Sequence, residues 1–251
     1  MGLCRLCRYE QPLVKSHVIP EAFFRELREG DVSPILISNG PNRPPRRAPI
    51  GVYDQTILCS TCEGKFQSLD DYGIQILLKD VREKFRPLIR KDAAWAHEGD
   101  VDQERVLRFL LAVLWRASVS THGFYSKVKL GPHEEAAAQL IRQPSSPVPP
   151  LFAAIISIWE ASSETERMTA IVQDPYPERW EGVLAYRFYL GKVVAYIKVS
   201  QLPFRPPLYE CSIGMQPFLV AISRNFDTSK DLKLMKKVAN QSRLTYLRKT
   251  R

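Results

Sequence analysis

The spacing of apolar residues changes its period along the chain, and this change divides the sequence. Between residues 100 and 143, apolar positions recur at helical spacing. The run from Arg105 to Arg116 is apolar over most of its circumference, which predicts a central core helix. The acidic residues of Asp100–Glu104 suit the first turn of such a helix, because they face its positive end. A second helix is expected from His133 to about Gln143.

Beyond residue 150 the pattern is typical of strands. A proline-rich segment at 144–150 interrupts the chain and predicts a boundary between two parts of the structure. Gly191 and Lys192 separate two apolar runs, which predicts a tight hairpin. The expected strands are Phe152–Trp159, Met168–Val172, Val183–Leu190, Val193–Val199 and Phe218–Ile222.

The N-terminal part of the chain combines short elements with a long loop. A loosely alternating strand is expected within Leu13–Ile19 and another at Tyr53–Leu58, with a short helix at Glu21–Leu27 between them. Proline and glycine recur from residue 31 to residue 53 and keep that stretch out of regular structure. From Thr61 a longer helix is expected, because apolar residues follow at roughly helical spacing.

Size and composition are those of an ordinary globular protein. The 251 residues are 45% hydrophobic and 25% charged, enough for one large domain or two small ones with a hydrophobic core. No stretch approaches ~20 uninterrupted apolar residues, so a membrane-spanning helix is not expected. The start of the chain, Met1–Leu6, lacks the apolar core of a secretory signal, and a cytoplasmic location is therefore expected.

The chain carries a formal net charge of +9, with a sequence pI of about 9.4. A surplus of this size favours polyanionic partners, nucleic acid before membrane, because the positive charges are clustered. One cluster, Arg43, Arg46 and Arg47, lies in the proline-rich loop. Another is the basic tail that includes Lys236 and Lys237, which is either a solvated terminal helix or a nucleic-acid contact.

A third group of basic residues lies on the expected core helix. Arg105, Arg108 and Arg116 fall on one stripe of it, at about 100° per residue. We interpret this stripe as a solvated face, and contact with phosphate is the alternative.

Four of the five cysteines form two Cys-x-x-Cys pairs, Cys4 with Cys7 and Cys59 with Cys62. In an intracellular chain such pairs favour metal over disulfides, and four thiolates complete a tetrahedral zinc site. A site with four thiolate ligands has no open position for water, so this zinc is expected to be structural rather than catalytic. The fifth cysteine, Cys211, is interpreted as a small buried hydrophobic residue in a strand.

One histidine lies inside the loop that the two cysteine pairs close. His17 stands within the segment Ser16–Pro20, where a metal-built frame would hold a single titratable imidazole. The alternative is that His17 caps a turn or hydrogen-bonds within the zinc loop. The other histidines, His97, His122 and His133, are interpreted as structural or solvated.

The order of these motifs resembles the four-cysteine branch of the HNH endonucleases. The resemblance rests on Cys4-x-x-Cys7, on Ser16-His17-Val18-Ile19-Pro20 and on Leu58-Cys59-Ser60-Thr61-Cys62-Glu63, and it covers about the first 75 residues. Members of that family clasp a metal ion with two strands and a helix, and they cut DNA. The resemblance implies that His17 is the general base that activates water, a role that suits an imidazole titrating near neutral pH.

The same resemblance implies ligands for one divalent ion, Mg²⁺ or Mn²⁺, at the scissile phosphate. Glu63 stands where the family usually has a metal-binding Asn or His, and its carboxylate suits a hard cation. Asp54 stands where the family often has an Asn that fixes the loop, and the site is expected to use Glu63 together with Asp54 or Asp70 as metal ligands. Asp70 and Asp71, one to two turns further on, are substitute ligands. Ser16 stands where an acidic ligand often precedes the histidine, so the chain departs from the family pattern there and at Glu63.

Together these observations predict an α+β protein in three parts. Residues 1–92 are expected to form a zinc-stabilised ββα module of HNH type with a trailing helix, followed by a central helical segment at 100–143. Residues 151–251 are expected to form a strand-rich α+β region that ends in the basic tail.

The expected function is metal-dependent cleavage of nucleic acid, DNA before RNA, with Arg43, Arg46 and Arg47 holding backbone phosphates. The motif order also resembles uncharacterised bacterial proteins among which roles in phage defence are common. Two alternatives stay open. One is a non-catalytic zinc module that binds nucleic acid, and the other is a subunit of a larger complex that docks a protein partner through its C-terminal region.

Overall fold

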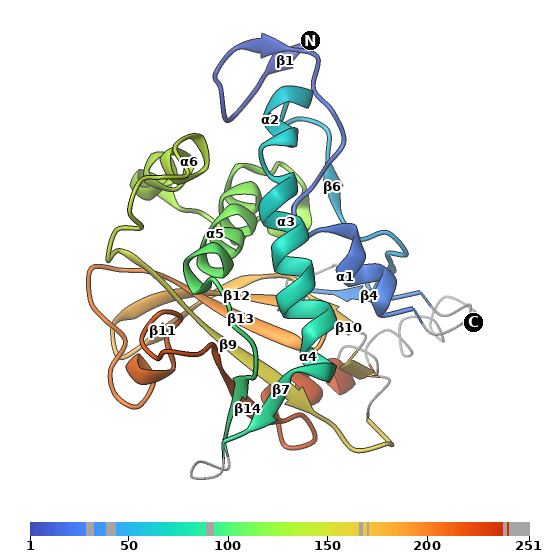
Figure 1. Ribbon diagram of the computed structural model, residues 1–251. Coiled ribbons are helices and arrows are strands. Elements are labelled where there is room, and N and C mark those ends of the chain that lie inside the picture. Colours follow the sequence, from blue (N-terminus) through green and yellow to red (C-terminus); the bar gives the residue numbers. More distant parts are fainter. Residues whose placement is uncertain are drawn as a thin grey trace, which may run out of the picture.

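A sheet of seven strands forms the centre of the protein (Figure 1). The computed structural model describes residues 1–28, 33–38, 44–88, 93–165, 168–169, 171–237 and 240. Neighbouring strands of this sheet are antiparallel, except for β9 and β14, which run parallel. The strand order is β11-β12-β13-β9-β14-β8-β7, and the strands are β7 (Phe85–Pro87), β8 (Ala94–His97), β9 (Phe152–Glu160), β11 (Tyr176–Trp180), β12 (Val183–Leu190), β13 (Val193–Val199) and β14 (Val220–Asn225).

The predicted hairpin between β12 and β13 is confirmed. Gly191 has a φ of 65°, the left-handed conformation that glycine adopts without steric cost and that tight hairpins require. On one face of these strands the side chains are uniformly apolar and buried, and this face packs against the helix α5. The apolar residues of this face include Ile156, Ile158, Phe188, Leu190, Ala195 and Ile197.

The central core helix is also confirmed, as α5 (Gln103–Val119). Its N-cap is Asp102, whose side chain accepts a hydrogen bond from the backbone N–H of Arg105 at 3.0 Å. All residues of α5 from Val106 onward are buried, because the sheet lies on one side and the helices α3 (Gln67–Ile74) and α6 (Glu134–Arg142) lie on others. The contact between α3 and α5 is close, since a Cβ on Gly73 would lie 2.3 Å from the ring of Phe109.

This packing corrects the interpretation of the arginine stripe as a solvated face. Arg108 is 8% exposed and Arg116 is fully buried. Arg108 donates to Glu104 and to the carbonyl oxygens of Leu140 and Ser146, so its charge is satisfied inside the protein. A 3.6-residue period identifies the stripe but not what covers it, and here other helices cover it.

The helical segment after the second cysteine pair is longer than one regular helix. It consists of α2 (Ser60–Gly64), α3, a π-helical turn at Gln75–Lys79 and α4 (Asp80–Glu83), and it leads into β7. His97, at the end of β8, contacts this helical segment, since its Nε2 lies 3.1 Å from Oδ2 of Asp80. Both side chains are 2% exposed, so His97 has a structural role, as expected.

The remaining elements are short. The stretch predicted as a loop at 31–53 contains β4 and β5, and β4 pairs in parallel with β10 from the distant C-terminal region. Cys211 lies in a 3₁₀ turn at Tyr209–Cys211 and is only partly buried, which corrects the expected buried strand position. The short elements are β1 (Gly2–Leu3), β2 (Glu10–Gln11), β3 (Ser16–His17), α1 (Glu21–Glu26), β4 (Ile35–Ile37), β5 (Arg46–Arg47), β6 (Tyr53–Asp54), β10 (Ile171–Gln173) and further 3₁₀ turns at Gly123–Tyr125 and Gly131–His133.

The protein is therefore mixed α+β, built around one large sheet. The three parts predicted from the sequence share one hydrophobic core, in which Leu58, Leu110 and Ile197 belong to the same cluster of buried side chains. In the part of the chain that the structure covers, no helix combines the length and the hydropathy needed to cross a bilayer.

Candidate metal centre and its surroundings

The four paired cysteines come together at the end of the molecule that holds the N-terminus (Figure 1). Their sulfur atoms all lie within 4.8 Å of one another. Cys4 and Cys7 lie in the turn between β1 and β2, where Arg8 adopts a left-handed φ of 66° and its N–H donates to the Cys4 carbonyl at 2.9 Å. The second pair consists of Cys59, the N-cap of α2, and Cys62 within that helix.

Backbone hydrogen bonds tie the two cysteine turns together. The N–H of Arg5 donates to the carbonyl of Ile57 at 2.8 Å, and the N–H of Cys59 points to Sγ of Cys4 at 3.4 Å. Burial of the Cys4 thiol opposes its ionisation, but backbone N–H groups outweigh that effect and lower its pKa from 9.0 to about 7. A thiol that ionises at neutral pH is suited to bind a cation.

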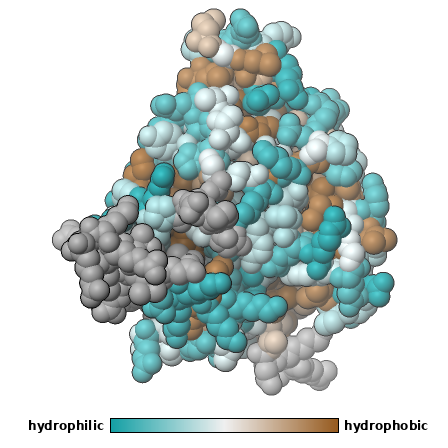
Figure 2. All heavy atoms as spheres, turned by 180° about the vertical axis from the view of Figure 1, so that it is seen from behind, coloured by the Kyte–Doolittle hydropathy of each residue, from teal (hydrophilic) through white to brown (hydrophobic). Residues whose placement is uncertain are grey.

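This donor set fits zinc. In a tetrahedron with Zn–S bonds of about 2.3 Å, the sulfur atoms are about 3.8 Å apart, and the cluster in this chain is compatible with that spacing. Four thiolates would occupy every position of a tetrahedral ion, so such a zinc would be structural. Hydrophobic residues surface at this end of the molecule (Figure 2), where Met1 and Leu3 are exposed.

His17 lies next to this frame, on the two-stranded antiparallel sheet of β3 and β6. Ser16 pairs with Asp54 and His17 pairs with Tyr53, and the His17 and Tyr53 rings meet edge to face at 5.8 Å. The His17 ring makes a hydrogen bond to the backbone of Ile50, whereas Nε2 has no hydrogen-bond partner among the described residues. Burial lowers the pKa of His17 below its usual 6.5, so the imidazole is neutral at pH 7.

Glu63 faces His17's strand from the first turns of α2. Oγ of Ser16 donates to Oε2 of Glu63 at 2.6 Å. Burial raises the pKa of Glu63, and the hydrogen bond from Ser16 partly opposes that rise. The two positions at which the sequence departs from the family pattern, Ser16 and Glu63, are thus paired with each other.

Asp70 is held by a buried cation from the core helix. Arg116 donates to both carboxylate oxygens of Asp70, at 2.6 and 2.8 Å, and to the carbonyl oxygen of His17 at 3.0 Å. Its guanidinium also lies over the ring of Phe66 at 4.7 Å. Arg116 therefore joins the core, the helix α3 and the strand of His17.

Asp54 is saturated with hydrogen bonds. Its oxygens accept from the backbone N–H groups of Thr56, Thr121 and His122 and from the hydroxyl groups of Thr56, Ser120 and Thr121, at 2.6 to 3.3 Å. Burial would raise the pKa of Asp54, but these donors lower it from 3.8 to about 2. The carboxylate fixes the chain after α5 to the two-stranded sheet of β3 and β6, which is a structural use of the side chain.

The residues predicted to contact nucleic acid are exposed where the structure describes them. Arg46 and Arg47 form β5, a few residues before Ile50, whose backbone contacts His17. Lys236 and Lys237 lie on the outer surface of a helical stretch at 230–237. Arg43 lies outside the described residues.

Two residues of this region were not predicted from the sequence. Glu21, on α1, places Oε2 4.0 Å from Nε2 of His17, while its other oxygen accepts from Arg25 at 2.7 Å. The sequence held a signal for this contact, because Glu21 follows His17 by four residues, with Pro20 between them. Arg116 had no such signal, because its partners are distant in the sequence.

Apart from the four cysteines, the described residues contain no group of three or more His, Cys, Asp or Glu ligand atoms close enough to share an ion. The chain matches no protein family model, no curated protein and no solved structure.

Proposed function

We propose that the protein is a metal-dependent endonuclease of HNH type that hydrolyses phosphodiester bonds of DNA. The observation that carries the proposal is the placement of His17. It lies on the antiparallel pair of β3 and β6, and β6 leads through Cys59 into the short helix α2, with Glu63 on that helix hydrogen-bonded to the residue beside His17. This order of strand, strand and helix is the one that the HNH resemblance implies.

The geometry favours His17 as the general base. Its imidazole is neutral at pH 7, its Nε2 makes no hydrogen bond within the described structure, and the carboxylate of Glu21 lies 4.0 Å away. A neutral ring accepts a proton from water, and a nearby carboxylate stabilises the imidazolium that results. Lys15 lies over Tyr53 beside this ring, where a cation would attract the phosphate backbone.

Among the candidate metal ligands, Glu63 is favoured. The oxygens of Asp54 are occupied by six donors and those of Asp70 by Arg116, whereas Glu63 accepts a hydrogen bond only from Ser16 among the side chains that the structure describes. A divalent ion held there would neutralise charge at the scissile phosphate. Arg116 would keep the strand of His17 in place through the backbone carbonyl.

The second candidate is a zinc module that binds nucleic acid without cutting it. The observation in its favour is the pairing of the acidic side chains with Ser16 and Arg116, which leaves few oxygens for a second ion. This candidate predicts binding that weakens steeply with salt and no cleavage in any divalent ion.

A plasmid assay separates the two candidates. Supercoiled DNA is incubated with zinc-loaded protein and Mg²⁺, Mn²⁺ or Ni²⁺, beside a His17→Ala variant of equal zinc content. Nicking by the wild type that falls by at least about a hundredfold in the variant is expected, the usual contribution of a general base. Cleavage that survives in His17→Ala would overturn the assignment of His17.

Two further variants control this result. Glu63→Gln keeps an acceptor for Ser16 but removes the negative charge, so it is expected to abolish cleavage and leave the zinc content unchanged. His133→Ala removes a histidine at the start of α6, remote from the cysteine cluster in the sequence, and is expected to cleave like the wild type. A plasmid that is shifted on a gel but not nicked by any variant would favour the non-catalytic candidate.

A further inference from the structure

The second face of the seven-stranded sheet is unlike the apolar face that covers α5. Residues that pair directly across strands point to the same side of a sheet. On this side Arg187 stands opposite Tyr196, Tyr176 stands opposite Arg187, and Arg224 stands opposite Trp159. Arg187 and Tyr196 are 4% and 3% exposed, so polar groups are buried here, which costs free energy unless each finds a partner.

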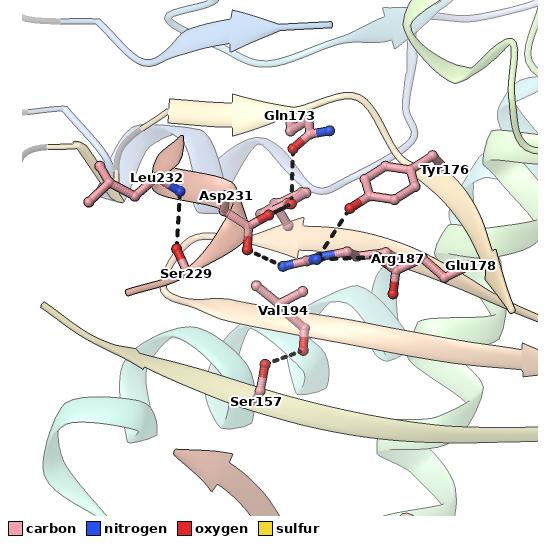
Figure 3. A network of polar contacts seen from close by, with 10 residues as sticks. Ser157, Gln173, Tyr176, Glu178, Arg187, Val194, Ser229, Asp231 and Leu232 are labelled. Carbon is pink, nitrogen blue, oxygen red and sulfur yellow. Dashed lines mark hydrogen bonds and ion pairs between the residues drawn. The ribbon is translucent and has the colours of Figure 1, made fainter. Parts of the chain in front are cut away.

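At one end of this face, many of the polar side chains have hydrogen-bond or ion-pair partners within the protein (Figure 3). Arg187 lies between Asp231, at 2.5 Å, and the side chains of Tyr176 and Glu178, at 3.2 and 3.3 Å. Oη of Tyr189 lies 2.5 Å from Oδ1 of Asp231. Asp231 comes from the helical stretch at 230–237, so this stretch is held against the sheet by an ion pair.

An open groove of about 810 Å³ begins beside this network. It lies over β9, β11, β12, β13 and β14, and two of its lining residues leave buried polar atoms without partners among the described residues. These atoms are Oη of Tyr196 and Nε of Arg187. Buried hydroxyl and guanidinium groups are seldom left unpaired in a protein unless a ligand or water completes them.

Arg224 adds an uncompensated charge to the groove. Its guanidinium lies over Trp159 at 4.8 Å and over Tyr196 at 5.7 Å, and no carboxylate of the described chain lies within 4.0 Å of it. Burial lowers the pKa of Arg224, and the charge of Arg187 lowers it further. An anion beside Arg224 would offset both effects.

The lining combines positive charge with aromatic rings. Among the described residues, Arg187, Arg224 and Lys230 on this face stand against two carboxylates, Glu178 in the lining and Asp231 beside it, which leaves a surplus of one positive charge. The ring of Trp180 also lines the groove, with its centroid 4.7 Å from that of Tyr196. A volume of about 810 Å³ exceeds what a phosphate ion fills and lies in the range of sites for ligands with a ring system.

We propose that this groove binds a nucleoside phosphate, either free or at the end of a nucleic-acid strand. Arg224 and Lys230 bind the phosphate, Trp180 stacks on the base, and Tyr196 donates its hydroxyl proton to the ligand. The arginine side chains provide the planar donors that phosphate groups prefer. The proposal goes beyond the proposed nuclease function and does not depend on it, because the groove contains none of the residues around His17.

Calorimetric titration of the full-length, zinc-loaded protein tests the proposal. The probes are AMP, CMP, GMP and UMP, with the uncharged nucleosides, inorganic phosphate and a short single-stranded oligothymidylate with a terminal phosphate. At least one monophosphate or the oligonucleotide is expected to bind, about tenfold or more tighter than its nucleoside and than phosphate alone. Tighter binding of the oligonucleotide identifies a strand end as the ligand, and tighter binding of a mononucleotide identifies a free nucleotide.

Three variants locate the binding. Arg224→Met is expected to weaken it by about tenfold or more, because a charge-assisted contact is lost. Tyr196→Phe is expected to weaken it by roughly three- to tenfold while the melting temperature stays equal or rises, because the hydroxyl has no hydrogen-bond partner among the described residues. Arg86→Met removes an exposed cation on β7, at the far edge of the sheet, and is expected to bind like the wild type.

The proposal is overturned if none of these probes binds, or if Arg224→Met and Tyr196→Phe bind as tightly as the wild type. It is also overturned if Arg86→Met weakens binding as much as Arg224→Met, since the contact would then be non-specific attraction between charges. A nuclease-inactive protein that binds a monophosphate through Arg224 would support this site and refute only the proposed function.

Discussion

Arg116 offers the sharpest test of how the core supports the candidate site. It is fully buried in the last turn of α5, and it joins Asp70 to the backbone of His17. The two partners differ in burial, because the side chain of Asp70 is 18% exposed and that of Arg116 is 0% exposed. Removing one partner therefore has a different consequence from removing the other.

The expected magnitudes follow from that asymmetry. Asp70→Ala leaves a guanidinium buried without its carboxylate, and breaking a buried ion pair in this way costs about 3–5 kcal/mol of unfolding free energy. Arg116→Met leaves a carboxylate that water reaches, so it is expected to cost less, about 1–3 kcal/mol, chiefly from lost hydrogen bonds. The double variant is expected to cost about as much as Arg116→Met alone, which corresponds to a coupling of about 3–5 kcal/mol, equal to the cost of Asp70→Ala.

Urea unfolding of the zinc-loaded proteins measures these values, followed by circular dichroism and by tryptophan fluorescence, to which the buried Trp115 that stacks on Phe66 contributes. Asp71→Ala is the matched control, because Asp71 is the exposed neighbour of Asp70 on the same helix, and it is expected to change stability by about 0.5 kcal/mol or less. Additive effects of the two single substitutions, or an Asp70→Ala variant as stable as Asp71→Ala, would refute the reasoning.

Two further predictions concern the metal centre and the imidazole. Removing zinc with a chelator is expected to abolish hydrogen-exchange protection around the cysteine turns, because β1 and β2 have only two residues each. The strands β12 and β13 are expected to stay protected, because the sheet has its own core. Uniform loss of protection would contradict this prediction. The imidazole of His17 is expected to titrate below 6.5 in NMR spectra of the folded protein, because burial disfavours its charged form. The stability that depends on the neutral imidazole of His17 is then complete above pH 6.5 and is lost as the pH falls below that value. A midpoint of the NMR titration at or above 6.5 would be inconsistent with burial as the dominant cause.

The cysteine cluster shows what local spacing can predict. A Cys-x-x-Cys pair places two sulfur atoms on one tight turn, so each half of the site is encoded within four residues. The sequence also predicted that the two halves meet, because a tetrahedral site needs four ligands and the one further cysteine, Cys211, has no neighbouring cysteine to pair with. It did not predict the contacts that orient the halves, such as the bond from Arg5 to the carbonyl of Ile57.

The core helix shows where periodicity stops being informative. The apolar pattern at 105–116 predicted α5 correctly, and the hairpin at Gly191 followed from the same kind of local reasoning. The arginine stripe was misinterpreted because a polar position on a helix has the same appearance in the sequence whether solvent or another element covers it. Arg116 is buried only because Asp70, 46 residues away, provides the opposite charge.

The amino-acid sequence by itself therefore determined the elements whose causes lie within a few residues: the cysteine turns, the helix α5, the paired strands β12 and β13, and the segment around His17. The tertiary structure alone decided which polar side chains are used for structure and which stay available. It assigned Asp54 and Asp70 to hydrogen bonds with distant donors, and it gathered arginine and aromatic residues of four strands along one groove. The physical reason is that burial and charge pairing depend on the neighbours that folding brings together, and no period in the sequence encodes those neighbours.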